Sequence, residues 1–192
     1  MKRLMLLGLA VALAALVAIP AQATTITFDA LGGGNGTTFT SYSEGGFVVA
    51  ASSGDWRVAN MWGNPTPDIF CVFPPESPSV HVTAVGGSLF QFQTVDLSTG
   101  LGQGSFSIAG FLGGSQVLAQ QGSMGYPFST VSSVNASQRL DLLVITESRG
   151  TCSSANIDNI SVVAAPVPLP GTLLLLGPGL VGLAALRRRY KR

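Results

Sequence analysis

A few carboxylates at the ends of predicted strands are the residues of this sequence best suited to chemistry. Asp158 shares strand parity with Ile160 and Val162, so we expect it to face the interior of the domain, where a carboxylate needs partners. Two arrangements meet that need. One is a structural Ca²⁺ with backbone carbonyls and Asp29 or Glu44 as further ligands, and the other is a set of backbone N–H donors at a turn. Calcium is the one cofactor suggested, although no compact D-x-D-x-D loop is present.

The residue patterns that could indicate a catalytic site are weaker evidence than the buried carboxylate. Asp141 and Glu147 share parity, but an extended strand would separate them by about 20 Å, beyond the roughly 5–10 Å between glycosidase carboxylates. His81 is the only histidine and alternates with Val80 and Val82, which indicates a surface position and excludes a multi-histidine zinc site. No G-x-S-x-G elbow is present. We therefore expect a non-catalytic protein. The alternative is a polysaccharide-active enzyme, a glycosidase or lyase, with an acidic pair drawn from other strands.

Four aromatic residues are candidates for stacking on sugar rings, because an amphipathic ring combines contact area with a polar group. Trp56 and Trp62 lie in an irregular stretch punctuated by Gly, Asn and Pro, and the other two are Tyr42 and Tyr126. The alternative for each is packing in the core or anchoring of a loop.

The elements that must position these residues are short strands. Apolar runs separated by Gly, Asn, Ser and Pro clusters, without a sustained helical period, predict an all-β domain at residues 24–165. About nine or ten strands suit a jelly-roll-like antiparallel β-sandwich. The predicted elements are a hairpin of 80–85 with 88–97, a second hairpin of 105–112 with 115–121 about Gly113-Gly114, a bulge before Val95, a central strand at 140–145 and a closing strand at 157–163.

The two ends of the chain differ from this domain. Met1–Ala23 has basic residues at Lys2 and Arg3, then an apolar run, and closes with Pro20-Ala21-Gln22-Ala23, which predicts a signal peptide removed by signal peptidase. Residues 166–192 contain a proline-rich spacer, the apolar run Thr172–Leu186 and a basic tail. This order predicts a single transmembrane helix of roughly 24 Å whose basic end stays cytoplasmic.

Once the two ends are set aside, the charge and the cysteines of the body can be considered separately. All nine acidic residues but only Arg57, Arg139 and Arg149 lie in the body, so its net charge is −6 and a nucleic-acid partner is disfavoured. Cys71 and Cys152 both lie in the exported body, which favours one disulfide. Closing a loop of about 80 residues could contribute roughly 4 kcal/mol on the chain-entropy model. The alternative is two buried free thiols.

The tail resembles a PEP-CTERM sorting signal. The resemblance lies in Val167-Pro168-Leu169-Pro170-Gly171, the Leu/Gly run and the arginine cluster, with Leu169 where the usual motif has Glu. It implies export across the inner membrane, transient membrane anchoring and processing by an exosortase in an exopolysaccharide-producing Gram-negative bacterium. The final location would be the cell surface or the extracellular matrix.

The body is similar, in a looser way, to carbohydrate-binding-module-like and galactose-binding-like jelly rolls. The matching segments are Ile26-Thr27-Phe28-Asp29, Tyr42–Val48 and the closing Ile157-Asp158-Asn159-Ile160-Ser161-Val162. The resemblance implies that the first and last strands are neighbours, which would bring Asp29 near Asp158. It also implies a β-sandwich that binds polysaccharide or packs with it in a matrix.

Overall fold

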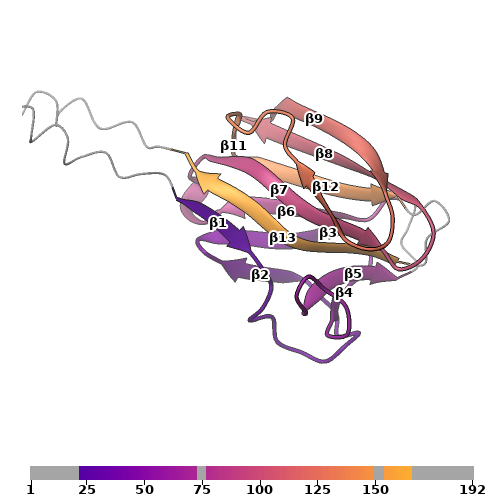
Figure 1. Ribbon diagram of the computed structural model, residues 1–192. Coiled ribbons are helices and arrows are strands. Elements are labelled where there is room, and N and C mark those ends of the chain that lie inside the picture. Colours follow the sequence, from indigo (N-terminus) through magenta and orange to yellow (C-terminus); the bar gives the residue numbers. More distant parts are fainter. Residues whose placement is uncertain (1–21, 73–76, 149–153, 166–192) are drawn as a thin grey trace, which may run out of the picture. The chain divides into compact units, whose positions relative to one another are not determined.

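Strands with alternating burial form two antiparallel sheets in the computed structural model, which describes residues 22–72, 77–148 and 154–165 (Figure 1). The described residues contain thirteen strands and one short 3-10 turn, η1 (Val85–Gly87). Residues Gln22–Ala165 make up one compact unit. The predicted all-β antiparallel sandwich is therefore confirmed.

Sheet A has seven strands and is organised around β13, the last strand of the domain. Its main path runs β10 (Ser129–Ser132), β7 (Phe90–Thr99), β13 (Ser154–Ala164), β5 (Asp68–Val72) and β4 (Trp56–Ala59). Two further strands join it, β1 (Ala23–Ile26) beside β13 and β11 (Arg139–Leu140) beside β7.

Sheet B has six strands in one continuous path, and β12 lies near its centre. The order is β2 (Ser41–Glu44), β3 (Phe47–Ser53), β6 (Ser79–Ala84), β12 (Leu142–Ser148), β8 (Gly104–Leu112) and β9 (Ser115–Met124). The strand β9 forms one edge of this sheet and β2 the other.

The apolar face of each sheet forms the core between them. On β8, Phe106 and Ile108 are buried while Ser105 and Ser107 are exposed, as a strand with one buried face requires. On β7, Phe90 and Phe92 are buried, and the ring of Phe90 meets that of Phe47 edge to face with centroids 5.5 Å apart. The polar face of sheet B is thereby left toward solvent.

The second predicted hairpin is confirmed and the first is wrong. The strands β8 and β9 pair across Gly113-Gly114, and both glycines have the positive φ that a tight hairpin turn requires. The segments at 80–85 and 88–97 belong to different sheets, because β6 pairs with β3 and β12 whereas β7 pairs with β13. Glycines 86 and 87 connect the two layers of the sandwich.

Of two other local predictions, one needs correction and one is confirmed. The segment 140–145 is divided, since Leu140 belongs to β11 of sheet A and the central strand β12 starts at Leu142. The predicted bulge in β7 is confirmed by register shifts against β13, in which Thr94 lies opposite Ser161 and Phe92 opposite Val162.

Among the described residues, no helix is both long enough and apolar enough to span a bilayer. The predicted transmembrane helix and the motif Val167-Pro168-Leu169-Pro170-Gly171 lie outside the described residues, as does the predicted signal peptide up to residue 21. Ala23, the last residue of that prediction, lies in β1 opposite Val163 of β13. The first and last strands of the unit are therefore neighbours.

Candidate functional site

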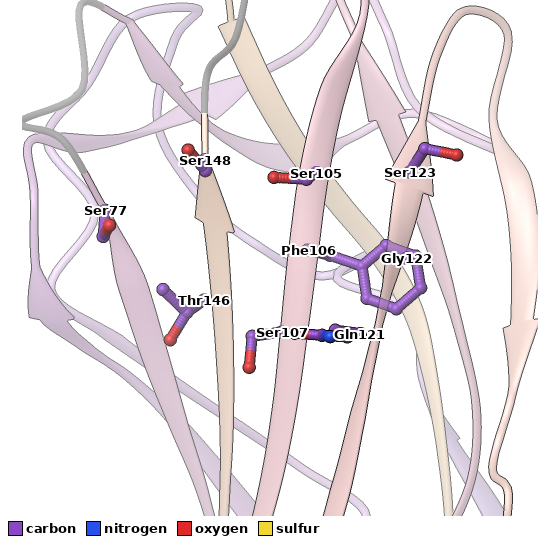
Figure 2. Close-up of a pocket in the computed structure, with 9 residues that line it drawn as sticks. All are labelled: Ser77, Ser105, Phe106, Ser107, Gln121, Gly122, Ser123, Thr146 and Ser148. Carbon is purple, nitrogen blue, oxygen red and sulfur yellow. The ribbon is translucent and has the colours of Figure 1, made fainter.

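A groove of about 590 Å³ crosses the outer face of sheet B at the end where β12 finishes (Figure 2). Strand register places its side chains in two rows. Thr146 of β12, Ser107 of β8 and Gln121 of β9 are opposite one another in the first row. The second row is Ser148, Ser105 and Ser123 on the same three strands, and Ser77 completes the lining just before β6.

The floor of the groove depends on a close contact between β8 and β9. Phe106 points toward the core, and Gly122 lies opposite it on β9. A Cβ atom on Gly122 would approach the Phe106 ring to 2.7 Å, so the glycine leaves room for that ring (Figure 2). Any larger residue at position 122 would displace the ring and alter the floor.

The chemistry of the lining is that of hydroxyl and amide groups. None of the nine lining residues is ionisable. Serine, threonine and glutamine both donate and accept hydrogen bonds, which matches the hydroxyl and ring oxygens of an uncharged sugar. The described lining residues offer several groups that can bind a hydroxyl group and none for general acid–base catalysis.

The structure places Trp56 and Tyr42 away from this groove. Trp56 is 1% exposed in the core, and its indole Nε1–H donates to the carbonyl of Ser53 at 2.8 Å. Tyr42 is half-buried, with its ring 5.5 Å from that of Phe28. Burial first, and then the nearby Glu44 carboxylate, raises the pKa of Tyr42. The prediction that Trp56 presents its ring to a ligand is therefore replaced by a core role.

Trp62 and Tyr126 are exposed but lie on separate loops. Trp62 is 52% exposed in the connection from β4 to β5, where its ring meets Phe70 at 6.5 Å between centroids. Tyr126 is 70% exposed just after β9. Neither lines the groove. The four aromatic residues do not form one stacking platform.

Asp158 lies in a buried polar cluster rather than among the core side chains next to Ile160. Asp158 is buried, as expected, but a bulge at Asn159, with φ +47°, breaks the alternation that was expected to place it on the same face as Ile160. The Asp158 carboxylate accepts hydrogen bonds from the backbone N–H groups of Asn64 at 2.6 Å and Asn159 at 2.8 Å. Its strand neighbour Asp96 accepts from the side chains of Asn64, Asn159 and Thr130.

The other two carboxylates expected at a calcium site have different surroundings. Glu44 accepts hydrogen bonds from the backbone N–H groups of Thr27 and Phe28 and from the Thr27 hydroxyl. Asp29 is exposed. Among the described residues, no group of three or more His, Cys, Asp or Glu side chains is placed to hold a metal ion. Asp29, Glu44 and Asp158 are thus not brought together as one ligand set.

Burial changes the acidity of three carboxyl groups. Desolvation, with Asp96 and Asp29 nearby, raises the pKa of Asp158 to about 7 against the effect of its two N–H donors. Desolvation also raises the pKa of Asp68 to about 7, although Asn156 donates to it. Glu147 is fully buried, and desolvation together with Asp68 raises its pKa well above the ordinary value. Neither carboxylate oxygen of Glu147 has a hydrogen-bond partner among the described residues.

Cys71 is a free, buried thiol in the structure, so the predicted disulfide with Cys152 is not formed there. Cys152 lies outside the described residues. The Cys71 sulfur is packed close to Gly54, where a Cβ atom would approach it to 3.2 Å. Burial, with the Asp55 and Glu147 carboxylates nearby, raises the pKa of the Cys71 thiol to about 11.

Sequence reasoning missed the serines, threonine and glutamine of the groove. The alternation Ser105-Phe106-Ser107-Ile108 can be read from the sequence and indicates that the two serines share one face of that strand. What was not visible is that β12 lies beside β8, which sets Thr146 and Ser148 next to Ser107 and Ser105. Hydroxyl groups along one strand can line a groove only when neighbouring strands place further polar side chains beside them.

Comparison with known proteins found no matching family model and no matching curated protein. Solved structures with a similar layout include a family 29 carbohydrate-binding module from Piromyces equi, at 10% identity and TM-score 0.46, covering 77% of this chain and 93% of that one. The CBM22-1 xylan-binding domain from Paenibacillus barcinonensis Xyn10C has 13% identity and TM-score 0.47, with 79% and 100% covered. The family 11 module of the cellulosomal cellulase Lic26A-Cel5E of Clostridium thermocellum has 12% identity and TM-score 0.44, with 79% and 100% covered. At these identities and TM-scores, the similarity assigns no ligand to this chain.

Proposed function

We propose that this protein is an exported, non-catalytic surface or matrix protein whose sandwich binds a segment of an uncharged polysaccharide along the groove of sheet B. The observation that supports this most directly is the pair of rows Thr146–Ser107–Gln121 and Ser148–Ser105–Ser123. Strands lie about 4.8 Å apart, so each row repeats hydrogen-bonding groups across the sheet over roughly 10 Å. A chain of sugars presents hydroxyls in a similarly repeating way.

The charge of the domain favours an uncharged glycan over an acidic one. The body carries a net charge of −6, and the described residues that line the groove include no cationic side chain to offset the repulsion of a polyanion. The absence of an aromatic platform in the lining favours recognition through hydrogen bonds. Such binding is weak for each contact and gains strength from several contacts in series.

The enzymatic alternative has less support. Asp96 and Asp158 are opposite each other in sheet A, but both are buried and both accept hydrogen bonds from Asn64. The described residues that line the groove contain no carboxyl group. A glycosidase needs two carboxyl groups open to the scissile bond. Binding without turnover therefore fits the site better.

The binding proposal predicts a loss of affinity on removing groups from the first row. In residues 22–165, Ser107→Ala combined with Gln121→Ala should weaken glycan binding about thirtyfold, because each of the two lost hydrogen bonds contributes about 1 kcal/mol. The assay is affinity electrophoresis against uncharged and acidic polysaccharides. The matched control is Ser41→Ala with Ser43→Ala on the far edge strand β2. Equal loss in both variants, or no binding by the unmodified domain to any polysaccharide, would contradict the proposal.

Export and sorting rest on the two terminal segments. Expressed in an exosortase-containing host, the chain should lose Met1–Ala23 and then the tail. Replacing Pro168 and Pro170 by alanine should leave the unprocessed protein in the membrane fraction, whereas Pro166→Ala, outside the motif, should be processed normally. Fractionation with N-terminal sequencing measures both outcomes. A cytosolic product that retains Met1 would refute this part of the proposal.

A further inference from the structure

The edge strand β9 is long and has no partner on its outer side in the described structure. It contains ten residues, and it pairs with β8. Three other edge strands, β2, β4 and β10, have four residues each. Across the described residues, no backbone hydrogen bond other than those to β8 joins β9 to the rest of the chain. A ten-residue edge presents about 33 Å of free main-chain donors and acceptors.

The hydrogen bonds that join residues 132–134 to this strand in the described structure are made by one side chain of β9. The Gln120 amide donates to the carbonyl of Ser132 at 2.8 Å and accepts from the N–H of Val134 at 3.0 Å. Gln120 has the parity of Leu118, which is buried in the core, so these bonds lie on the sheet A side of β9. The main-chain groups of the edge are not used by them.

The same region is free of charge. No Asp, Glu, Lys, Arg or His occurs between Asp96 and Arg139, a stretch that includes all of β8, β9 and β10. Native proteins usually protect an edge with charged residues, proline or short length, and β9 has none of these. The rest of the body carries its net charge of −6, so the β9 edge is where two copies can approach with least repulsion.

We propose that β9 pairs antiparallel with β9 of a second copy of this chain, so that sheet B continues from one protomer into the other. An edge strand paired with itself in this way forms a two-fold symmetric contact, in which one strand supplies both complementary sides. A second copy is the fitting partner because its own β9 has the same length and the same lack of charge. The pairing is independent of whether the groove binds glycan.

The geometry has a consequence for the groove. In an antiparallel continuation, outward residues of both copies stay on one face of the joined sheet. Gln121 and Ser123 of β9 line the groove at this edge, so the two grooves would lie side by side on that face. Long glycans could then engage both grooves, which would raise their apparent affinity relative to short ones.

The test is the mass of residues 22–165 in solution, since this unit contains both sheets and its own core. Sedimentation velocity and light scattering should show a dimer. Val117→Glu with Ala119→Glu places like charges along the seam and should weaken dimerisation by about tenfold or more. Val85→Glu with Ser88→Glu, at the exposed turn η1, adds the same charge elsewhere and should leave the dimer intact.

Hydrogen exchange of the unmodified domain gives a second readout, which does not depend on whether a substituted domain folds. Amides of β9 should become more protected as protein concentration rises, while those of the edge strand β2 should not change. A monomer at every concentration would overturn the proposal, as would a dimer that survives the charges in β9. Protection of the β9 amides that appears only when a different protein is added would also overturn the proposal.

Discussion

Replacing Glu147 by methionine is expected to raise the free energy of unfolding by about 2–3 kcal/mol at about pH 8. Glu147 is fully buried on β12, and neither of its carboxylate oxygens has a hydrogen-bond partner in the part of the chain that the structure describes. Methionine has a similar length and no group that needs a partner. The substitution therefore removes the cost of desolvating the carboxyl group with little change in packing.

The gain should depend on pH in a defined direction. Desolvation, and then Asp68, raises the pKa of Glu147 well above its ordinary value of 4.5. Between 4.5 and the raised pKa, the folded protein keeps a proton that the unfolded chain has released. Stability therefore falls by about 1.4 kcal/mol per pH unit over that range. Below 4.5 both states are protonated, and the stabilising contribution of the neutral form is fully present.

Other groups around Glu147 set the slope that remains in the variant. On β5, the Asp68 carboxyl group and the Cys71 thiol interact electrostatically with Glu147. Their pKa values are about 7 and about 11. Asp158, with a pKa of about 7, adds a further decline between about 3.8 and 7. The variant should thus have a shallower loss of stability with pH than the unmodified domain. Urea denaturation at a series of pH values measures both slopes.

Glu44→Met provides the matched control. The Glu44 carboxylate accepts three hydrogen bonds from Thr27 and Phe28, so its removal leaves donors unsatisfied and should lower the free energy of unfolding. If Glu147→Met were less stable than the unmodified domain at every pH, with an unchanged slope, Glu147 would have partners that the structure does not contain.

The second large effect is expected from Trp56→Ala, which should cost about 3–5 kcal/mol of stability. Trp56 is 1% exposed on β4 within the core, and its indole N–H is bonded to Ser53. Truncation leaves a cavity between the sheets and removes that bond. Trp62→Ala, at a side chain that is 52% exposed, should cost less than about 1 kcal/mol.

Chemical denaturation and glycan binding together separate the two tryptophans. The Trp62 variant serves as the control for removal of an indole ring from the same β4–β5 region. A Trp56→Ala domain that kept its stability but lost glycan affinity would show that the ring serves a ligand and not the core. Loss of stability with affinity retained in the folded fraction is the expected pattern.

Several features of the fold could be predicted because they depend on neighbours in the chain. Alternation of Ser105, Phe106, Ser107 and Ile108 sets which face of β8 is buried, and two consecutive glycines at 113 and 114 permit the tight turn to β9. Steric and hydrophobic preferences over a few residues decide both. The same is true of the apolar shift between Phe92 and Val95 that marks the bulge in β7.

Features that depend on which strand lies beside which could not be predicted. Glycines 86 and 87 suit a hairpin as well as they suit the crossover between sheets that the structure contains. The left-handed backbone at Asn159 breaks the alternation between Asp158 and Ile160, and it accompanies hydrogen bonds of these residues with Asn64 and Asp96, which are distant in the chain. Trp56 lies in a stretch that is irregular in sequence, yet it is covered by core residues from both sheets.

Composition and short-range periodicity are enough to predict the class of the domain, its acidic charge and the distinct character of its two ends. The hydroxyl groups that line the groove, the carboxyl groups that are desolvated and the edge strand that is left open could be identified only once the strands were placed in the sheets. Each of these depends on lateral pairing between strands far apart in the chain. The free energy of such pairing comes from the packing of the whole sandwich and not from any one segment.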